Sequence, residues 1–463
     1  MRVITFVCLD KMGGGDIATT LEMIRSLKNN SVFSGVEINL VDFTMKDPST
    51  NSSFLTGITN YIHVKTTNNS AGMRREDYFI SAPESTLAQF IDLLARSDGI
   101  VLYPRTPGES ENMCAWETIV RQYLEPHKNK MISVTEPSGS EEEKSGYCLT
   151  QNRLHLGFHR SSAGVPYPDV SSTCLTSPEA VQLNALHAET GAKFFFIYGH
   201  TIEHLSRFLV TIINMSKNQT NPIVFVIVGF NRYTHQGNNP PESLKQYIDV
   251  EIEKAPFTLG LEGEFSQIPS IAPLLSTDPT QTLTNSFYFV HFQEVTPVCF
   301  IELMRISENI TGCTGAHSLA TAISLLKVPF YEALYEYHKG MYRDLMLSST
   351  YMKPVLSYME FIWDGKIKFD FHHRELRGQV SWNELFDGFL RSISSPTHVS
   401  EFLKQARIQT DMTEKFPIVL IEATGDMRNP PSPALFFTQV ASDADSPEQA
   451  ISSTTQKKPG DQF

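Results

Sequence analysis

The chain has 463 residues, of which 41% are hydrophobic and 19% charged, a balance typical of a soluble globular protein with two or three domains. Its formal net charge of -13 argues against nucleic acid or an anionic membrane surface as partner, because neither attracts an acidic body. No apolar run approaches the roughly 18 residues of a transmembrane helix. We therefore expect a chain with no transmembrane segment that is cytoplasmic where it is made, with export to a host as the open alternative.

The six cysteines are scattered, and none belongs to a C-x-x-C pair. Several fall in apolar segments, so they predict buried reduced thiols rather than a disulfide framework or a zinc site.

The first half opens on a strand, a glycine-rich turn and a helix. Residues 3–8 are β-formers, the turn carries Gly13, Gly14 and Gly15, and apolar residues then recur at helical spacing from residue 17 to 27. Asp16 lies near the start of this helix, where the helix dipole favours a carboxylate. Strands are predicted at 36–42, 99–103 and 130–134, helices at 87–95 and 112–124, and loops from 44 to 82. This alternation predicts a parallel sheet with helices on its faces.

The second half repeats the pattern. Strands are predicted at 193–199, 222–229 and 288–292 and helices at 203–215 and 298–306. Residues 309–332 then form a strand, a loop, a helix and a strand. The loop consists of the small residues Thr314, Gly315, Ala316, His317 and Ser318, of which Ser318 is suited to cap the helix. Free N–H groups at such a helix start would suit a phosphate.

The remaining chain is helical and aromatic, with helices predicted at 382–393 and 399–406 and a last strand at 416–422. These patterns divide the chain into an N-terminal lobe (1–170), a second lobe (171–345), a helical extension packing on the lobes (346–440) and a polar disordered tail (441–463).

Two consecutive doubly wound lobes, with a glycine-rich first turn and a late small-residue loop, resemble the glycosyltransferases of the GT-B fold over roughly residues 2–345. More faintly, residues 10–16 resemble the first-lobe loop of bacterial arginine rhamnosyltransferases. The fold class is thus expected to be α/β, with two Rossmann-like lobes of GT-B type and a helical C-terminal extension.

The resemblance implies an acceptor lobe followed by a donor lobe. Asp16, with Asp10 as second candidate, would be the general base, and Gly13, Gly14 and Gly15 would form the acceptor loop. The loop of residues 314–318 would bind the donor diphosphate, helped by Gly199 and His200. In many relatives a glutamate on the late helix holds the donor ribose, whereas this chain has Ala320, Thr321 and Ala322 there.

The predicted function is transfer of a sugar from a nucleotide-sugar to an acceptor that is a small molecule, a glycan or a protein. Helix N-termini can stabilise the leaving diphosphate without a metal, and a carboxylate can take the acceptor's proton. We therefore expect an inverting, metal-independent glycosyltransferase with no cofactor besides its donor substrate.

Three alternatives remain. His200, Glu203 and His204 match H-x-x-E-H, the pattern of a zinc metallopeptidase, although they fall at the first turn of a helix. The missing carboxylate near Thr321 would suit a non-catalytic GT-B-like binding protein. A nucleotide-sugar epimerase would use the same cleft without a separate acceptor.

Overall fold

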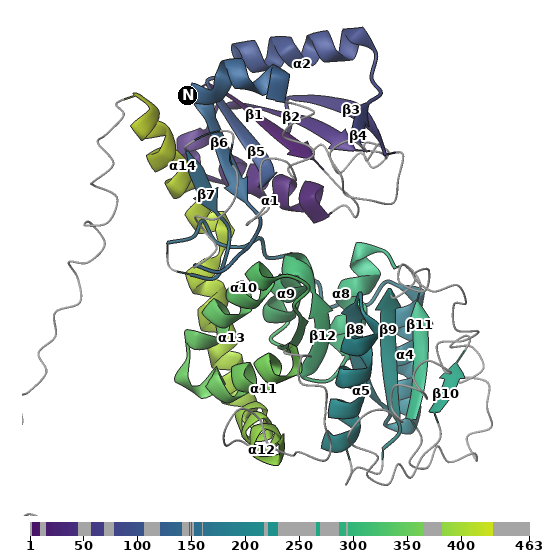
Figure 1. Cartoon of the computed structure of the whole chain (residues 1–463). Coiled ribbons are helices and arrows are strands. Elements are labelled where there is room, and N and C mark those ends of the chain that lie inside the picture. Colours follow the sequence, from purple (N-terminus) through teal and green to yellow (C-terminus); the bar gives the residue numbers. More distant parts are fainter. Residues whose placement is uncertain are drawn as a thin grey trace, which may run out of the picture.

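The computed structural model describes residues 2–9, 15–44, 57–68, 78–105, 121–140, 148, 150, 152–159, 161–216, 221–229, 265–268, 287–292, 295–363 and 382–428. Within these residues the chain forms two α/β lobes, stacked one above the other in Figure 1. The predicted disordered tail of residues 441–463 lies outside the described residues.

The sheet of the first lobe has the described strand order β4-β3-β2-β1-β5-β6-β7, parallel except for the edge strand β4. Its strands are β1 (Val3–Leu9), β2 (Glu37–Thr44), β3 (Asn60–Asn68), β4 (Tyr78–Ile80), β5 (Gly99–Arg105), β6 (Met131–Thr135) and β7 (Arg153–His155). Its helical segments are α1 (Gly15–Asn29), η1 (Ser31–Phe33), α2 (Glu84–Arg96) and η5 (Glu125–Lys130).

Alternating side chains of β1 explain why this sheet is covered on both faces. Ile4 and Phe6 pack in the same core as Ile24 of α1, whereas Val7 packs with Phe90 of α2 on the opposite face. Successive strand residues point to opposite faces of a sheet, so an unbroken apolar strand needs a helix on each side.

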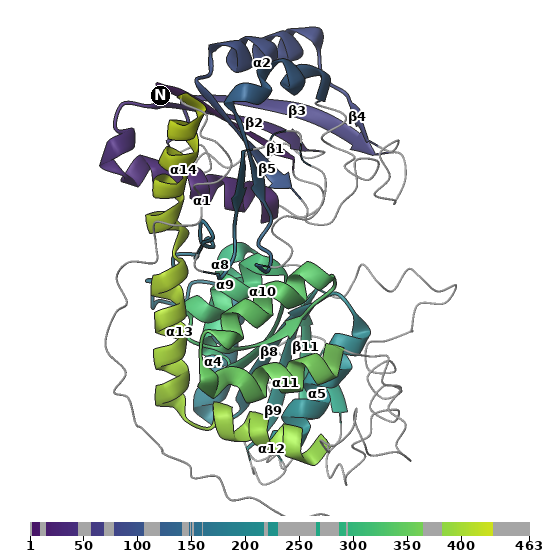
Figure 2. The same cartoon turned by 60° about the vertical axis from the view of Figure 1, so that its left-hand side comes forward.

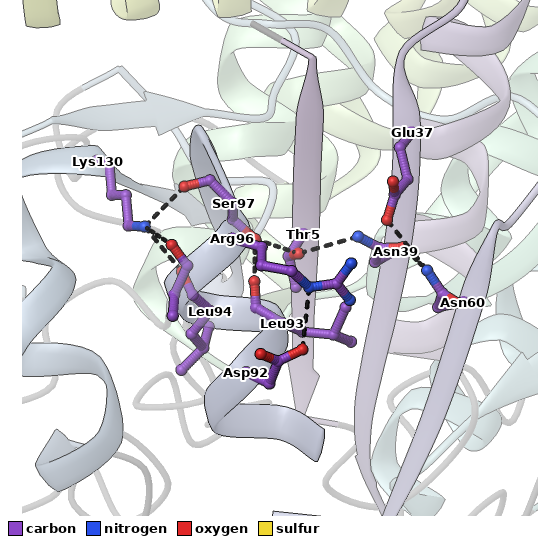
Figure 3. A network of polar contacts seen from close by, with 11 residues as sticks. Thr5, Glu37, Asn39, Asn60, Asp92, Leu93, Leu94, Arg96, Ser97 and Lys130 are labelled. Atoms are coloured by element: carbon purple, nitrogen blue, oxygen red, sulfur yellow. Dashed lines mark hydrogen bonds and ion pairs between the residues drawn. The ribbon is translucent and has the colours of Figure 1, made fainter. Parts of the chain in front are cut away.

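A buried polar network joins the strands of this lobe (Figure 3). The hydroxyl groups of Thr5 and Ser97 lie 2.6 Å apart, and the side-chain amide of Asn39 donates to Thr5 at 3.5 Å. Asn60 continues the network by donating to the side-chain oxygen of Asn39 at 2.8 Å. Because a one-residue slip would leave these buried groups without partners, the network fixes the register of β1, β2 and β3.

The sheet of the second lobe is parallel throughout the described strands, in the order β10-β11-β9-β8-β12-β13. Its strands are β8 (Lys193–Gly199), β9 (Ile223–Gly229), β10 (Phe265–Ile268), β11 (Phe287–Phe292), β12 (Ile310–Thr314) and β13 (Val328–Glu332). The helical segments that follow β7 are α4 (Pro178–Thr190), α5 (Ile202–Met215), α8 (Pro297–Ile306), α9 (Gly315–Ser324), α10 (Glu336–Leu347), η6 (Thr350–Met352), α11 (Lys353–Trp363), α12 (Trp382–Ile393), α13 (Pro396–Thr410) and α14 (Met412–Arg428).

Two crossing segments join the lobes. The N–H of Val165 donates to the carbonyl of Thr410 at 2.8 Å, and the N–H of Met412 returns a bond to Val165 at 3.1 Å. The connection into the second lobe therefore lies beside the junction of α13 and α14. Figure 2 shows the result: α13 runs along the second lobe and α14 along the first.

The strand predicted at residues 416–422 is wrong, because these residues belong to α14. Phe416 and Leu420 are one helical turn apart and are buried in the core shared with α1. The run of β-branched residues is therefore helical, since its apolar positions match a helix face on α1. The loops predicted from 44 to 82 are wrong in part, since this stretch contains β3 and β4.

The predicted architecture of two Rossmann-like lobes followed by C-terminal helices is confirmed. Among the five described cysteines Cys8, Cys299 and Cys313 are buried, and no disulfide bond joins any of the five.

Candidate functional site

The carboxyl ends of β8, β12 and β13 meet at one edge of the second sheet. β8 ends at Gly199, and at the ends of β12 and β13 Thr314 is the register partner of Glu332. β8 and β12 are neighbours although β9 follows β8 in the chain, so the strand order changes direction between them. Ligands of open α/β sheets bind outside the carboxyl ends at such a switch point. The predicted donor residues therefore lie at the edge where a ligand is expected.

Glu332 holds the turn between β8 and α5. Its carboxylate accepts hydrogen bonds from the N–H groups of His200 and Thr201, both at 2.7 Å, and from the Thr201 hydroxyl at 2.5 Å. The side chain is only 4% exposed. Burial acts to raise the pKa of Glu332, but nearby His204 and the bonds from Thr201 and His200 outweigh it and lower the pKa. The carboxylate is thus charged and serves as the anion at the N-terminus of α5.

Histidines on three helices lie at this end of the second lobe. His204 of α5, His317 of α9 and His338 of α10 each have a buried ring nitrogen that bonds to none of the described residues. Burial lowers the pKa of His204 and of His338 to about 4, and the pKa of His317 is lowered for the same reason. These imidazoles are therefore neutral near pH 7.

Aromatic rings fix two of these histidines. The ring centroid of His204 lies 5.4 Å from that of Phe330, which is two residues before Glu332 on β13. His338 lies among three tyrosine rings, at 4.5 Å from Tyr337, 5.4 Å from Tyr335 and 6.1 Å from Tyr331. Close packing of this kind limits the movement of both imidazoles.

The small-residue loop begins α9 earlier than predicted. The helix starts at Gly315, whose φ of +71° is the left-handed conformation that favours glycine. Apart from the adjacent residues and the backbone of α9 itself, no heavy atom lies within 4 Å of the position a Cβ would take there, so this side of the backbone is open. Gly315, Ala316 and His317 form the first turn, where N–H groups have no intrahelical acceptor. The open face and these donors lie together at the carboxyl end of β12.

Ser318 does not cap α9, which corrects the prediction. Its hydroxyl accepts from the N–H of Thr314 at 3.0 Å and donates to the carbonyl of the same residue. The helix starts three residues before Ser318, so the hydroxyl lies inside the first turn and ties it to β12.

The first lobe contributes carboxylates at the ends of its central strands. Asp16 is in the first turn of α1 and is half-buried. Burial raises the pKa of Tyr103 on β5, and the negative charges of Asp16 and Glu136 raise it further. Both carboxylates therefore lie near the Tyr103 hydroxyl group. Gly15 is the first residue of α1, whereas Asp10, Gly13 and Gly14 lie outside the described residues.

Helix α10 connects the two halves of the site. The Tyr337 hydroxyl donates to Glu136 at 3.2 Å, and Asp344 accepts from the N–H of Ser140 at 2.7 Å and from its hydroxyl at 3.2 Å. In Figure 1, α9 and α10 lie on the side of the second lobe that is nearer the first. The carboxyl edge of the first sheet therefore contacts the helix that carries His338.

The H-x-x-E-H pattern spans the start of α5. His200 precedes the helix, and the N–H of His204 bonds to the capping Thr201 hydroxyl at 3.3 Å. Across the ranges that the structure describes, no group of three or more His, Cys, Asp or Glu side chains is arranged to hold a metal ion.

Sequence reasoning missed Glu332 and His338. Glu332 follows a predicted strand at the same edge as Thr314, so its position could have identified it as a candidate site residue. His338 carried no such signal, because it belongs to an aromatic helix whose pattern indicates only packing.

No family model matches the sequence, and no curated protein is significantly similar to it. Solved structures are similar in arrangement. A glycosyltransferase from Rickettsia africae is 9% identical, with 91% of this chain and 98% of that chain covered and a TM-score of 0.46. Anabaena HepE in complex with UDP-glucose is 8% identical, with 91% and 99% covered and a TM-score of 0.45. S. aureus MnaA with UDP is 11% identical, with 93% and 95% covered and a TM-score of 0.40.

At these identities and TM-scores the similarity is limited to the path of the backbone, and it assigns no activity to this chain. The helices in the described parts of the chain include none with the length and apolar character needed to cross a membrane.

Proposed function

We propose that the protein is a glycosyltransferase that binds a nucleotide-sugar between its lobes. The observation that carries the proposal is the N-terminus of α9, which starts at the switch point of the second sheet with an open face at Gly315. Backbone N–H groups and the helix dipole at such a place favour the negative charge of a diphosphate. Gly315, Ala316 and His317 would supply these groups, with Thr314 and Ser318 holding the turn.

The chemistry follows from the groups at this end of the second lobe. Departure of the sugar leaves charge on the diphosphate, which fixed N–H groups can stabilise without reorganising. His317 and His338 would add donors, because a neutral imidazole can donate one hydrogen bond to a phosphate oxygen. We infer a metal-independent reaction, since these groups supply charge stabilisation by themselves.

The acceptor would be activated from the first lobe. Asp16 is half-buried at the start of α1, and a second carboxylate, Glu136, lies close to the same tyrosine. We assign Asp16 as general base, with Asp10, Gly13, Gly14 and Gly15 as its neighbours in the predicted acceptor loop. A base opposite the leaving diphosphate would invert the configuration of the transferred sugar.

A non-catalytic binding protein is the second candidate. The observation in its favour is that Glu332 already occupies the turn at Gly199 and His200, which the resemblance assigns to the donor. A protein of this kind would bind the nucleotide without turning it over.

The test is a melting-temperature screen of the full chain against nucleoside diphosphates and their sugars. A ligand that binds only the folded state raises the melting temperature in a concentration-dependent way. We expect such a rise with at least one nucleotide, followed by release of free sugar or of nucleoside diphosphate from the matching nucleotide-sugar. A rise without release would favour the binding protein, and no rise with any nucleotide would contradict both.

A further inference from the structure

The N-terminus of α5 has the donors of an anion-binding turn, yet its anion comes from the chain itself. Three donors from His200 and Thr201 converge on the two oxygens of Glu332, at 2.5 to 2.7 Å. Charge-assisted bonds to a carboxylate have such short lengths. The turn thus binds a carboxylate in the way a phosphate-binding turn binds a phosphate oxygen.

The surroundings keep this carboxylate charged and in place. Glu332 is 4% exposed, and the imidazole of His204, also 4% exposed, has a buried Nε2 that bonds to none of the described residues. Burial alone would raise the pKa of Glu332, and the hydrogen bonds from Thr201 and His200 help to lower it. Thr314 holds the same strand end by donating to the Glu332 carbonyl at 3.4 Å.

We propose that Glu332 is a positioning residue that fills the anion site at the N-terminus of α5 and so excludes a ligand phosphate from it. The inference deepens the proposed function and rests on it in one respect, the identity of the excluded phosphate as part of the donor. The donor diphosphate is then left to the first turn of α9. The N–H groups of His200 and Thr201 are then not available to a ligand phosphate.

If Glu332 fills this site, replacing it with a smaller residue should create a binding site for an added anion. Removing the carboxylate in Glu332→Ala leaves the N–H groups of His200 and Thr201 facing a space the size of the lost side chain. An added anion can then take the place of the carboxylate, and binding to the folded state alone raises the melting temperature.

The experiment uses the full chain with inorganic phosphate as the probe, compared with chloride at equal ionic strength. Leu209→Ala serves as the control, because Leu209 is a fully buried residue of the same helix and its loss destabilises α5 without exposing an anion site. We expect a saturable rise of about 2 °C or more in the melting temperature of Glu332→Ala. Wild type and Leu209→Ala have only the first turn of α9 for phosphate, so they should share one smaller rise.

Two further measurements cover a variant that folds poorly. If Glu332→Ala does not fold in chloride, refolding in phosphate or formate should restore it, and failure in both would overturn the proposal. Glu332→Gln keeps the shape and loses the charge, so we expect a lower melting temperature and no phosphate response. A melting temperature equal to wild type would overturn the role of the carboxylate.

Equal phosphate responses in Glu332→Ala, Leu209→Ala and wild type would also overturn the proposal. This outcome is separate from failure of the proposed function, because the phosphate titration uses no nucleotide. Wild type can fail to bind every nucleotide while Glu332→Ala still gains phosphate binding.

Discussion

The hydroxyl group of Tyr337 in the second lobe donates a 3.2 Å hydrogen bond to the carboxylate of Glu136 in the first lobe. Tyr337 precedes His338, whose ring lies 4.5 Å away, and Glu136 lies near Tyr103 and Asp16. The contact therefore joins the two sides of the candidate site, so that the separation of the lobes and the position of His338 are set together.

Replacing Tyr337 by Phe should weaken this connection. Loss of one hydrogen bond to a carboxylate costs about 1.5–3 kcal/mol of unfolding free energy, and a ligand that contacts both lobes should bind more weakly. Tyr351→Phe is the matched control, because that hydroxyl donates to the Arg391 carbonyl at 3.3 Å within the second lobe. Thermal melts and nucleotide titrations of both variants provide the check. Equal nucleotide affinities in the two variants would argue against a bridging ligand.

Gly312 tests the packing of the switch point. A Cβ at Gly312 would lie 2.4 Å from Cγ1 of Ile197, on the neighbouring strand β8. Gly312→Ala should therefore destabilise the protein by about 1–3 kcal/mol, the usual cost of overpacking. Adding Ile197→Ala should return part of that loss, although Ile197→Ala alone is destabilising. A double variant less stable than the sum of the two singles would contradict the assigned contact.

Acid should destabilise the protein between about pH 6.5 and pH 4. The folded-state pKa of His204 and of His338 is about 4, whereas an unfolded histidine titrates near 6.5. As the pH falls through this window the unfolded chain takes up protons that the folded chain does not, so stability falls. Each histidine contributes about 1.4 kcal/mol per pH unit.

His338→Phe should reduce the slope of the unfolding free energy against pH by the contribution of one histidine, about 1.4 kcal/mol per pH unit. Denaturant melts between pH 4 and 7 measure the slope, and Phe330→Leu is the control, because it alters packing next to His204 and removes no titrating group. An unchanged slope in His338→Phe would mean that His338 is protonated in the folded state.

The sequence predicted the parts of the fold that repeat a simple period. The structure has β8 at residues 193–199 and the unit from β12 to β13 within residues 309–332, as predicted. In both places the apolar runs, the glycine turns and the helical spacing indicate the same elements. The return of α14 to the first lobe was not predictable, since the partner surface of Phe416 and Leu420 on α1 is about 400 residues away in the chain.

The site was predicted only where it follows from strand ends. Gly199, Thr314 and Gly315 end or follow strands of one parallel sheet, so the sequence brings them together. Glu332 fills the turn at His200 because of its side-chain conformation. His338 lies near this edge because of the way α10 packs on the lobe. Neither leaves a period in the sequence.

Asp16→Asn tests the general base. If Asp16 accepts the acceptor's proton, turnover of the nucleotide-sugar identified by melting should fall about 10²–10⁴-fold. Glu84→Gln is the control, since Glu84 is an exposed acid in the first turn of α2 and its loss has the same small effect on a helix dipole. Equal turnover in the two variants with the fold preserved would remove Asp16 from the mechanism.

The central claim is that the first turn of α9 binds the donor diphosphate, and a matched pair of glycine variants tests it most directly. Gly315 has φ +71° and Gly35 has φ +78°, and beyond the adjacent chain neither has a heavy atom within 4 Å of its Cβ position. Aspartate at either place should therefore cost similar stability. Gly35 lies between η1 and β2 of the first lobe, away from the proposed turn.

The measurement is calorimetric titration of both variants with the nucleoside diphosphate that stabilises wild type. Gly35→Asp should bind it as wild type does, whereas Gly315→Asp places a carboxylate against the phosphates and should lose at least about tenfold in affinity, or 1.4 kcal/mol. Wild-type affinity in Gly315→Asp would contradict the claim that α9 holds the diphosphate.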